Sequence, residues 1–209
     1  MKIRTAALAA AAVLVLTSGT AAAATWWSPQ PTEVKPFLPA GTTNPAIADG
    51  VALGKLVATY TASGLGPAAA NPAAPADSPE RYVDFPGGSL PPGVTITEAQ
   101  ALNVLKRIKA NLAAAGLGLG DVVSMRAYLE KPPGAAEADF AGWNRAYRQF
   151  FANVDLATGK PVPVPLGTAP PAPPMEVNAA RPARVTLEIA NLPVAGWLVE
   201  VEVVAAYQR

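Results

Sequence analysis

The chain has 209 residues, with 16 lysines and arginines against 15 aspartates and glutamates, so its net charge is only +1. This balance gives no indication of nucleic acid or an anionic membrane as the main partner. Histidine and cysteine are both absent. That absence excludes disulfides, histidine-dependent triads, Cys–His pairs, zinc clusters of His and Cys, and the zinc site of nucleobase deaminases. Any chemistry must use Arg, Lys, Glu, Asp, Tyr, Ser, Thr, backbone groups and water.

Residues 1–24 have the pattern of a signal peptide. Lys2 and Arg4 form a charged start, residues 6–16 an apolar run, and residues 22–24 a small-residue cleavage pattern. An uncleaved membrane anchor is the alternative, but the apolar run is short for a membrane span. We therefore expect a periplasmic or secreted protein whose mature form keeps 185 residues, a suitable length for one domain.

The segment 25–44 is aperiodic and dotted with prolines, which predicts an extended N-terminal arm before a domain at 45–209. Trp26 and Trp27 could pack on the domain or on a neighbouring subunit, or lie exposed on a mobile terminus. Residues 54–67 are rich in β-branched and aromatic side chains and end in glycines, which predicts a strand and a turn.

Two proline-rich insertions interrupt the domain, at about 68–93 and 156–183. The first is expected to be a long loop, inside which residues 81–85 could form a short strand. The second has seven prolines between positions 161 and 174, which forbids a regular helix or a central strand. It is too long for an ordinary connection, so it is either functional or partly disordered.

Two amphipathic helices are expected. The first opens with a capping-box pattern at residues 97–100 and ends near Gly116, with apolar residues at helical spacing: Ala101, Leu102, Leu105, Ile108 and Leu112. The second covers 137–151 and points four aromatic residues inward: Phe140, Trp143, Tyr147 and Phe150. Core packing is a better explanation of these aromatics than a cofactor site.

Three further strands are expected at 121–130, 184–190 and 196–206. In the last, three valines share one face and Glu200 and Glu202 the other. Helices interleaved with a small mixed sheet predict an α+β fold, a two-layer α/β sandwich with both helices on one face of the sheet. The open face should also be apolar, so we expect self-association.

Four segments resemble the RidA/YjgF family of enamine/imine deaminases: "ALNVLKRIKANLAAAGLGLGDVVSMRAYL", "FAGWNRAYRQFF", "PARVTLEIANLP" and "GWLVEVEVVAA". They occur in the family's order and cover about half of the mature chain. The resemblance implies a chorismate-mutase-like fold, a homotrimer with sites in clefts between subunits, and no metal or organic cofactor. It also implies hydrolysis of an imine or enamine of a 2-keto acid to the keto acid and ammonia, as in 2-iminobutanoate/2-iminopropanoate deaminases.

The resemblance assigns two site residues. Arg184 matches the arginine that binds the substrate carboxylate, a role suited to its planar, permanently charged fork; otherwise it would be a strand-start arginine with solvent or a structural partner. Glu200 matches the glutamate that orients or activates water, and its alternative role is as an ion partner across an interface. Glu202 is better explained by a polar sheet edge.

Other positions depart from the family's pattern. Ile47 takes the place of a tyrosine that lines the cleft in many members, and Thr186 takes a place that is often cysteine. The serine-glycine after the first strand corresponds to Ser63 and Gly64 only with about three extra residues. An apolar residue at position 47 suits a larger apolar imine, or a protein that has lost catalysis.

Two other functions remain open from the sequence. A non-catalytic trimer could bind small carboxylates or protein partners in the same cleft, because pyridoxal-dependent production of enamines is cytoplasmic and this chain carries an export pattern. Ribonuclease or translation-inhibitor activity, often attributed to this family, is disfavoured by the lack of histidine and the neutral charge.

Overall fold

The computed structural model describes residues 27–208; the expected signal peptide and Trp26 lie outside the described residues. Three short 3-10 turns occur at Pro79–Tyr82, Pro86–Gly88 and Leu119–Asp121. The regular elements are, in chain order, β1 (Val34–Phe37), β2 (Gly50–Leu53), β3 (Thr59–Thr61), α1 (Ile96–Ala114), β4 (Val122–Glu130), α2 (Phe140–Arg148), β5 (Ala183–Ile189) and β6 (Val199–Ala206).

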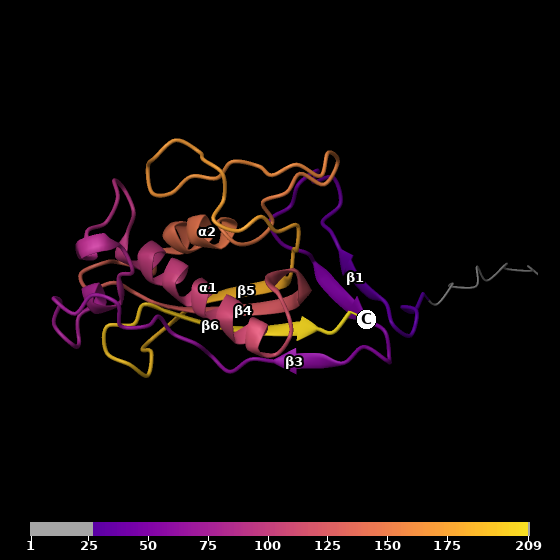
Figure 1. The fold of residues 1–209 in the computed structure, drawn as a ribbon, viewed down its shortest axis with the longest axis horizontal. Coiled ribbons are helices and arrows are strands. Elements are labelled where there is room, and N and C mark those ends of the chain that lie inside the picture. Colours follow the sequence, from indigo (N-terminus) through magenta and orange to yellow (C-terminus); the bar gives the residue numbers. More distant parts are fainter. Residues whose placement is uncertain (1–26, 209) are drawn as a thin grey trace, which may run out of the picture.

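The main sheet has four strands in the order β3-β6-β4-β5. β6 is antiparallel to β3 and β4, whereas β5 is parallel to β4, so the sheet is mixed. Figure 1 shows α1 and α2 together over these strands. Alternate residues of β4 and β6 are buried beneath the helices, as the strand period of two requires. The predicted α+β fold, with a mixed sheet and both helices on one face, is confirmed.

Helix α1 begins two residues earlier than the capping-box pattern predicted. Thr95 is the N-cap, and its side-chain oxygen accepts a hydrogen bond from the backbone N–H of Glu98 at 3.0 Å. Thr97 lies inside the first turn and is buried. The predicted stop is confirmed, because Gly116 adopts a φ of 75° directly after the helix.

Helix α2 is shorter than predicted and begins after Asp139, whose side chain accepts a hydrogen bond from the N–H of Gly142. Trp143, Tyr147 and Phe150 are buried as expected, but Phe140 is 36% exposed. Helical side chains lean toward the preceding turn. Phe140 is the first helical residue and has no such turn to cover it, so the prediction that it points inward is wrong.

The N-terminal third differs most from the prediction. The expected extended arm contains β1, which pairs antiparallel with β2 in a separate two-stranded sheet. Trp27 is half-exposed and contacts the ring of Phe37 edge-on at 5.1 Å. The strand expected at 54–67 is reduced to β3 and one isolated bridge at Leu65. The apolar pattern of the N-terminal third could not show which of its residues would pair with the main sheet and which would pair with the arm.

Both insertions lack long regular elements, as predicted, although the short strand considered at 81–85 is wrong because Pro79 opens a 3-10 turn there. The second insertion is held by buried side chains of the helices. One carboxylate oxygen of Glu98 accepts from Gly167 N at 2.9 Å, and Gln149 Nε2 donates to the Pro165 carbonyl at 2.9 Å. In Figure 1 this orange loop runs over α2, so it extends the helical layer.

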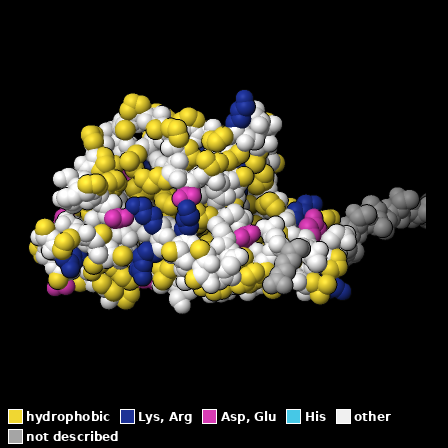
Figure 2. Space-filling model, in the orientation of Figure 1, with side chains coloured by type: hydrophobic (Ala, Val, Ile, Leu, Met, Phe, Trp, Pro, Cys, Tyr) yellow, Lys and Arg dark blue, Asp and Glu magenta, His cyan; other side chains and the backbone are white. Residues whose placement is uncertain are grey.

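The sheet face opposite the helices is not the apolar surface that the sequence predicted. Val185 and Leu187 of β5 are each 48% exposed there. In the middle of the face, however, Arg126, Tyr128 and Glu202 form a polar network. The alternation in β4 and β6 places these polar residues on the open side. On the helical side, Figure 2 shows charges of both signs interspersed among hydrophobic side chains.

Candidate active site

The start of β5 places Arg184 beneath helix α2. β5 is an edge strand, and in its pairing with β4 Arg184 is aligned with the buried Met125. Because strand residues alternate between faces, Arg184 and Thr186 both point toward the helical layer. Sequence order alone did not indicate which helix would cover them.

Two aromatic rings and an amide of α2 surround the Arg184 guanidinium. Its central carbon lies 4.3 Å from the centroid of the Tyr147 ring and 6.0 Å from that of Trp143. One terminal nitrogen, Nη2, donates a hydrogen bond to Asn144 Oδ1 at 2.7 Å. Trp143 and Tyr147 are four residues apart and therefore lie on one face of the helix. Asn144 is the next residue after Trp143.

The other terminal nitrogen of Arg184, Nη1, is buried and has no hydrogen-bond partner among the described residues. No described aspartate or glutamate forms an ion pair with Arg184 either. Burial lowers the pKa of Arg184 below its ordinary value, and the neighbouring Tyr147 opposes this change. A buried cation without an anion is costly, so this guanidinium is suited to accept an anionic ligand.

Tyr147 supports the guanidinium, and its phenol keeps its proton at neutral pH. Its ring is fully buried and stacks on Phe151 at a centroid distance of 5.3 Å. Its hydroxyl donates a hydrogen bond to the Ala46 carbonyl at 2.8 Å. Burial raises the pKa of Tyr147 above its ordinary value, although nearby arginines oppose this. The phenol therefore stays neutral and provides a fixed aromatic surface for Arg184.

Ile47 and Thr186 lie on the same side as Arg184. The segment that carries Ile47 runs beside the start of β5, where Ala48 forms a parallel bridge with Ala183. Ile47 is partly buried against the main core. Thr186 accepts a hydrogen bond from Trp143 Nε1 at 3.2 Å. These two predicted binding residues are therefore near the arginine.

Glu200, Ser63 and Gly64 form a second group, on the open face of the sheet. Gly64 lies directly beneath the Glu200 carboxylate: a Cβ built on this glycine would be 2.1 Å from Glu200 Oε1. The adjoining bridge between Leu65 and Val201 keeps this segment beside β6. Gly64 is thus required for the close approach of the carboxylate, and Ser63 is its exposed chain neighbour.

Glu202 belongs to a different arrangement from that of Glu200. Its Oε1 accepts hydrogen bonds from Tyr128 at 2.7 Å and from Arg126 at 3.1 Å. The bond from Tyr128 is the main reason that the pKa of Glu202 lies below its ordinary value, and Arg126 adds to the effect. Glu202 is therefore an ion-paired residue of the sheet surface, whereas no described residue donates a hydrogen bond to the Glu200 side chain.

The two groups do not meet within one chain. In the strand register, Arg184 is aligned with Met125 and Val203, whereas Glu200 pairs with Tyr128 three residues further along β4. Their Cα atoms are about 14 Å apart, because they are separated by two strand spacings across the sheet and by three residues along it. Because their side chains also point to opposite faces, one copy of the chain cannot place both on one small ligand.

Three residues that contact Arg184 were not predicted from the sequence as its neighbours. Trp143 and Tyr147 were expected to be plain core residues, and they do fill the core, but they also contact the guanidinium. Asn144 is an exposed helix residue, and no motif or periodicity distinguished it from any other surface amide. Only the packing of α2 over β5 identifies its partner.

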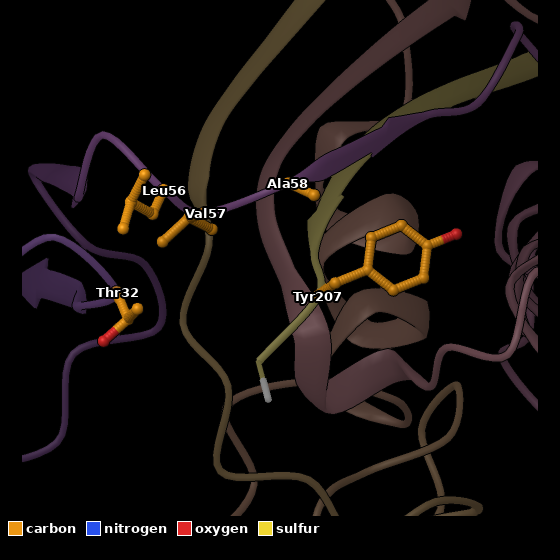
Figure 3. A pocket seen from close by; sticks show the side chains of 5 residues that line it. All are labelled: Thr32, Leu56, Val57, Ala58 and Tyr207. Atoms are coloured by element: carbon orange, nitrogen blue, oxygen red, sulfur yellow. The ribbon is translucent and has the colours of Figure 1, made fainter.

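In residues 27–208 no group of three or more acidic residues is placed to hold a metal ion. None of the described helices is long and apolar enough to cross a membrane. One hollow, of about 390 Å³, contains none of the candidate residues. Its lining side chains, shown in Figure 3, are uncharged: Thr32, Leu56, Val57, Ala58 and Tyr207. That lining is unsuited to binding a carboxylate.

Several solved structures are similar to this chain. E. coli TdcF with bound serine is 23% identical, with 85% of this chain and 93% of that chain covered and a TM-score of 0.41. The YjgF gene product of E. coli is 24% identical, with 85% and 98% covered and a TM-score of 0.40. Rv2704 of Mycobacterium tuberculosis, a member of the YjgF/YER057c/UK114 family, is 17% identical, with 84% and 100% covered and a TM-score of 0.39.

No curated protein matches the chain. The family model described as Endoribonuclease L-PSP matches residues 90–207, which is more than half of the 209 residues. The match includes α1, α2 and the three long strands, and therefore both Arg184 and Glu200. The chain accordingly belongs to this family, the RidA/YjgF family.

Proposed function

We propose that the protein hydrolyses reactive imines or enamines of 2-keto acids to the keto acid and ammonia. Membership of the RidA/YjgF family implies enamine/imine deaminase activity in general terms. The observation that supports the proposal for this chain is the half-buried Arg184 side chain, whose buried Nη1 has no hydrogen-bond partner and which has no carboxylate partner among the described residues. It suits a ligand that carries a carboxylate.

The reaction requires water to add to the imine carbon. In the protonated imine, the water oxygen forms a bond to that carbon while the C=N bond becomes a single bond, and the water loses a proton. In the resulting carbinolamine the C–N bond breaks, the hydroxyl loses its proton, and ammonia leaves behind a keto acid. Glu200 is the proposed group that accepts the water proton and returns one to the departing nitrogen. Arg184 holds the carboxylate throughout, so that the imine carbon stays in place.

Because Arg184 and Glu200 lie on opposite faces of one sheet, the proposed site requires two copies of the chain. We propose a homotrimer in which Arg184 of one subunit and Glu200 of its neighbour face the same cleft. The half-exposed Val185 and Leu187 on the edge strand β5 support this, since such residues gain by contact with another subunit. Light scattering on the mature protein tests it, and a monomer at micromolar concentration would contradict it.

The activity test uses imines generated in situ by an amino-acid oxidase, from alanine-derived to aromatic ones because Ile47 replaces the usual tyrosine. The protein should speed ammonia release. Arg184→Ala should lower the rate roughly 30- to 1000-fold, because it removes a charge-assisted contact. Arg184→Lys should restore only part, since an ammonium cannot present two parallel donors. Arg81→Ala is a matched control, because the Arg81 side chain binds no described residue except the Asn71 carbonyl in the first insertion.

A non-catalytic carboxylate-binding trimer is the second candidate, since the features of Arg184 suit binding as well as catalysis. It predicts Arg184-dependent binding of keto acids with no turnover of any imine in the panel. Glu200→Gln separates the two functions further: in a deaminase it should lower turnover while leaving keto-acid binding almost intact. A trimer that binds keto acids and turns over no imine would identify the protein as a binder.

A further inference from the structure

The hydroxyl of Thr186 is fixed in one orientation by the indole of Trp143. Trp143 is fully buried, and its Nε1 lies 3.2 Å from Thr186 Oγ1. An indole N–H can only donate a hydrogen bond. The threonine oxygen must therefore be the acceptor in this contact, which leaves its own hydrogen to point elsewhere.

That hydrogen has no acceptor among the described residues, and Thr186 is only half-buried. Thr186 is two residues after Arg184 in β5, so the two side chains share a face and their Cβ atoms are about 7 Å apart. A carboxylate that binds the guanidinium on the side of Thr186 would have its next carbon between the arginine and the threonine. The free O–H is therefore available to a group on that carbon.

We infer that Thr186 is a specificity-determining residue that donates a hydrogen bond to an oxygen on the carbon next to the ligand carboxylate, with Trp143 as its positioning residue. The inference rests on the proposed binding of a carboxylate by Arg184. The ligands it selects are 2-oxo and 2-hydroxy acids, in preference to carboxylic acids with a plain CH₂ at that position.

This contact has a consequence for the proposed reaction. A protonated imine nitrogen has no free electron pair, so it cannot accept a hydrogen bond from Thr186. The hydroxyl of the carbinolamine and the oxygen of the keto acid both can. Thr186 thus stabilises the species formed after water has added more than it stabilises the bound substrate, which is how an interaction raises turnover.

The test compares pyruvate with propionate, which differ at the carbon next to the carboxylate. Calorimetry should give the unmodified protein a preference for pyruvate of about tenfold, the size of one hydrogen bond. Thr186→Val, of nearly the same shape, should bring the ratio of dissociation constants close to one. Thr186→Ser should keep the preference. Trp143→Phe, which removes the indole N–H, should give an intermediate ratio because the threonine hydroxyl can then rotate.

The outcomes separate this inference from the proposed function. If both acids bind in an Arg184-dependent manner and Thr186→Val leaves their ratio unchanged, the inference about Thr186 is wrong and the carboxylate site stands. If neither acid binds in an Arg184-dependent manner, both proposals are overturned. Circular dichroism of each variant establishes folding, and Thr186→Ser keeps the comparison decisive should Trp143→Phe be unstable.

Discussion

Arg184 and Glu200 project from opposite faces of the same four-stranded sheet, and one strand, β4, lies between the strands that carry them. Arg184 contacts the helical layer through Tyr147 and Asn144, whereas Glu200 lies over Gly64 on the open side. A site that uses both must be shared between subunits, and this relationship can be tested directly.

The first prediction concerns complementation between two inactive variants. Arg184→Ala and Glu200→Gln chains, co-expressed and assembled together, should regain about one quarter of the unmodified activity. If the two chains assemble at random, about one quarter of the interfaces combine an intact Arg184 from one chain with an intact Glu200 from its neighbour. The measurement is ammonia release by the mixed trimers, with each variant alone as the control. No recovery in mixed trimers would contradict a site shared in this way.

The second prediction concerns Gly64. In Gly64→Ala the new methyl group would displace the Glu200 carboxylate, whose Oε1 lies 2.1 Å from the built Cβ position. Because this is the far end of a flexible side chain, the thermal midpoint should change little while deaminase activity falls about tenfold or more. Gly50→Ala is the control, since no atom lies within 4 Å of its built Cβ. Unchanged activity of Gly64→Ala would argue against a role for Glu200 in this position.

The third prediction concerns the junction of α1, α2 and the second insertion. The fully buried Glu98 accepts two hydrogen bonds from Arg145, at 2.9 and 2.7 Å, and one from Gly167 N. Glu98→Ala leaves the arginine and the amide without their partner and should destabilise the fold by about 3 kcal/mol. Urea unfolding measures this.

The matching control for Glu98 is an exposed ion pair on the same helix. Lys106 and Asp84 lie 2.7 Å apart, but their side chains are 50% and 46% exposed. Lys106→Ala should therefore cost less than about 1 kcal/mol. Equal losses for the two variants would show that the buried contacts of Glu98 add nothing beyond an ordinary surface pair.

The fourth prediction is a pH dependence from Glu202. Its pKa is lowered in the folded protein, mainly by the hydrogen bond from Tyr128. A carboxylate whose pKa is lowered by folding stabilises the protein above its unfolded pKa of about 4.3. This stabilisation is lost as the pH falls through the pKa of the folded state. The difference in thermal midpoint between the unmodified protein and Glu202→Gln should therefore shrink from about pH 6 to about pH 3. A constant difference would contradict the ionised contact.

The fifth prediction is export. The charged start, apolar run and small residues of the first 24 positions should be removed in the native host, so that the mature chain begins at or near Thr25. Mass spectrometry of the protein from that host gives the start directly. A chain that retains Met1 in the cell envelope would instead indicate the uncleaved anchor.

The sequence by itself determined the elements whose patterns are local. The spacing of Leu105, Ile108 and Leu112 predicted α1, and the alternation of valine and glutamate predicted the two faces of β6, because helix and strand periods act on neighbouring residues. The fold class and the family motifs followed from these segments. The start of α1 was misplaced by two residues, since Thr95 and Thr97 are equally plausible caps until packing buries one of them.

Only the tertiary structure decided which distant residues meet. The pairing of β1 with β2, the aromatic and amide contacts around Arg184, and the contact of Glu200 with Gly64 all depend on strand order and on helix placement over the sheet. A residue's own neighbours in the chain do not specify these. For the same reason the sequence could name Arg184 and Glu200 only as candidate site residues, and their separation onto opposite faces is set by the register of β5 and β6 against β4.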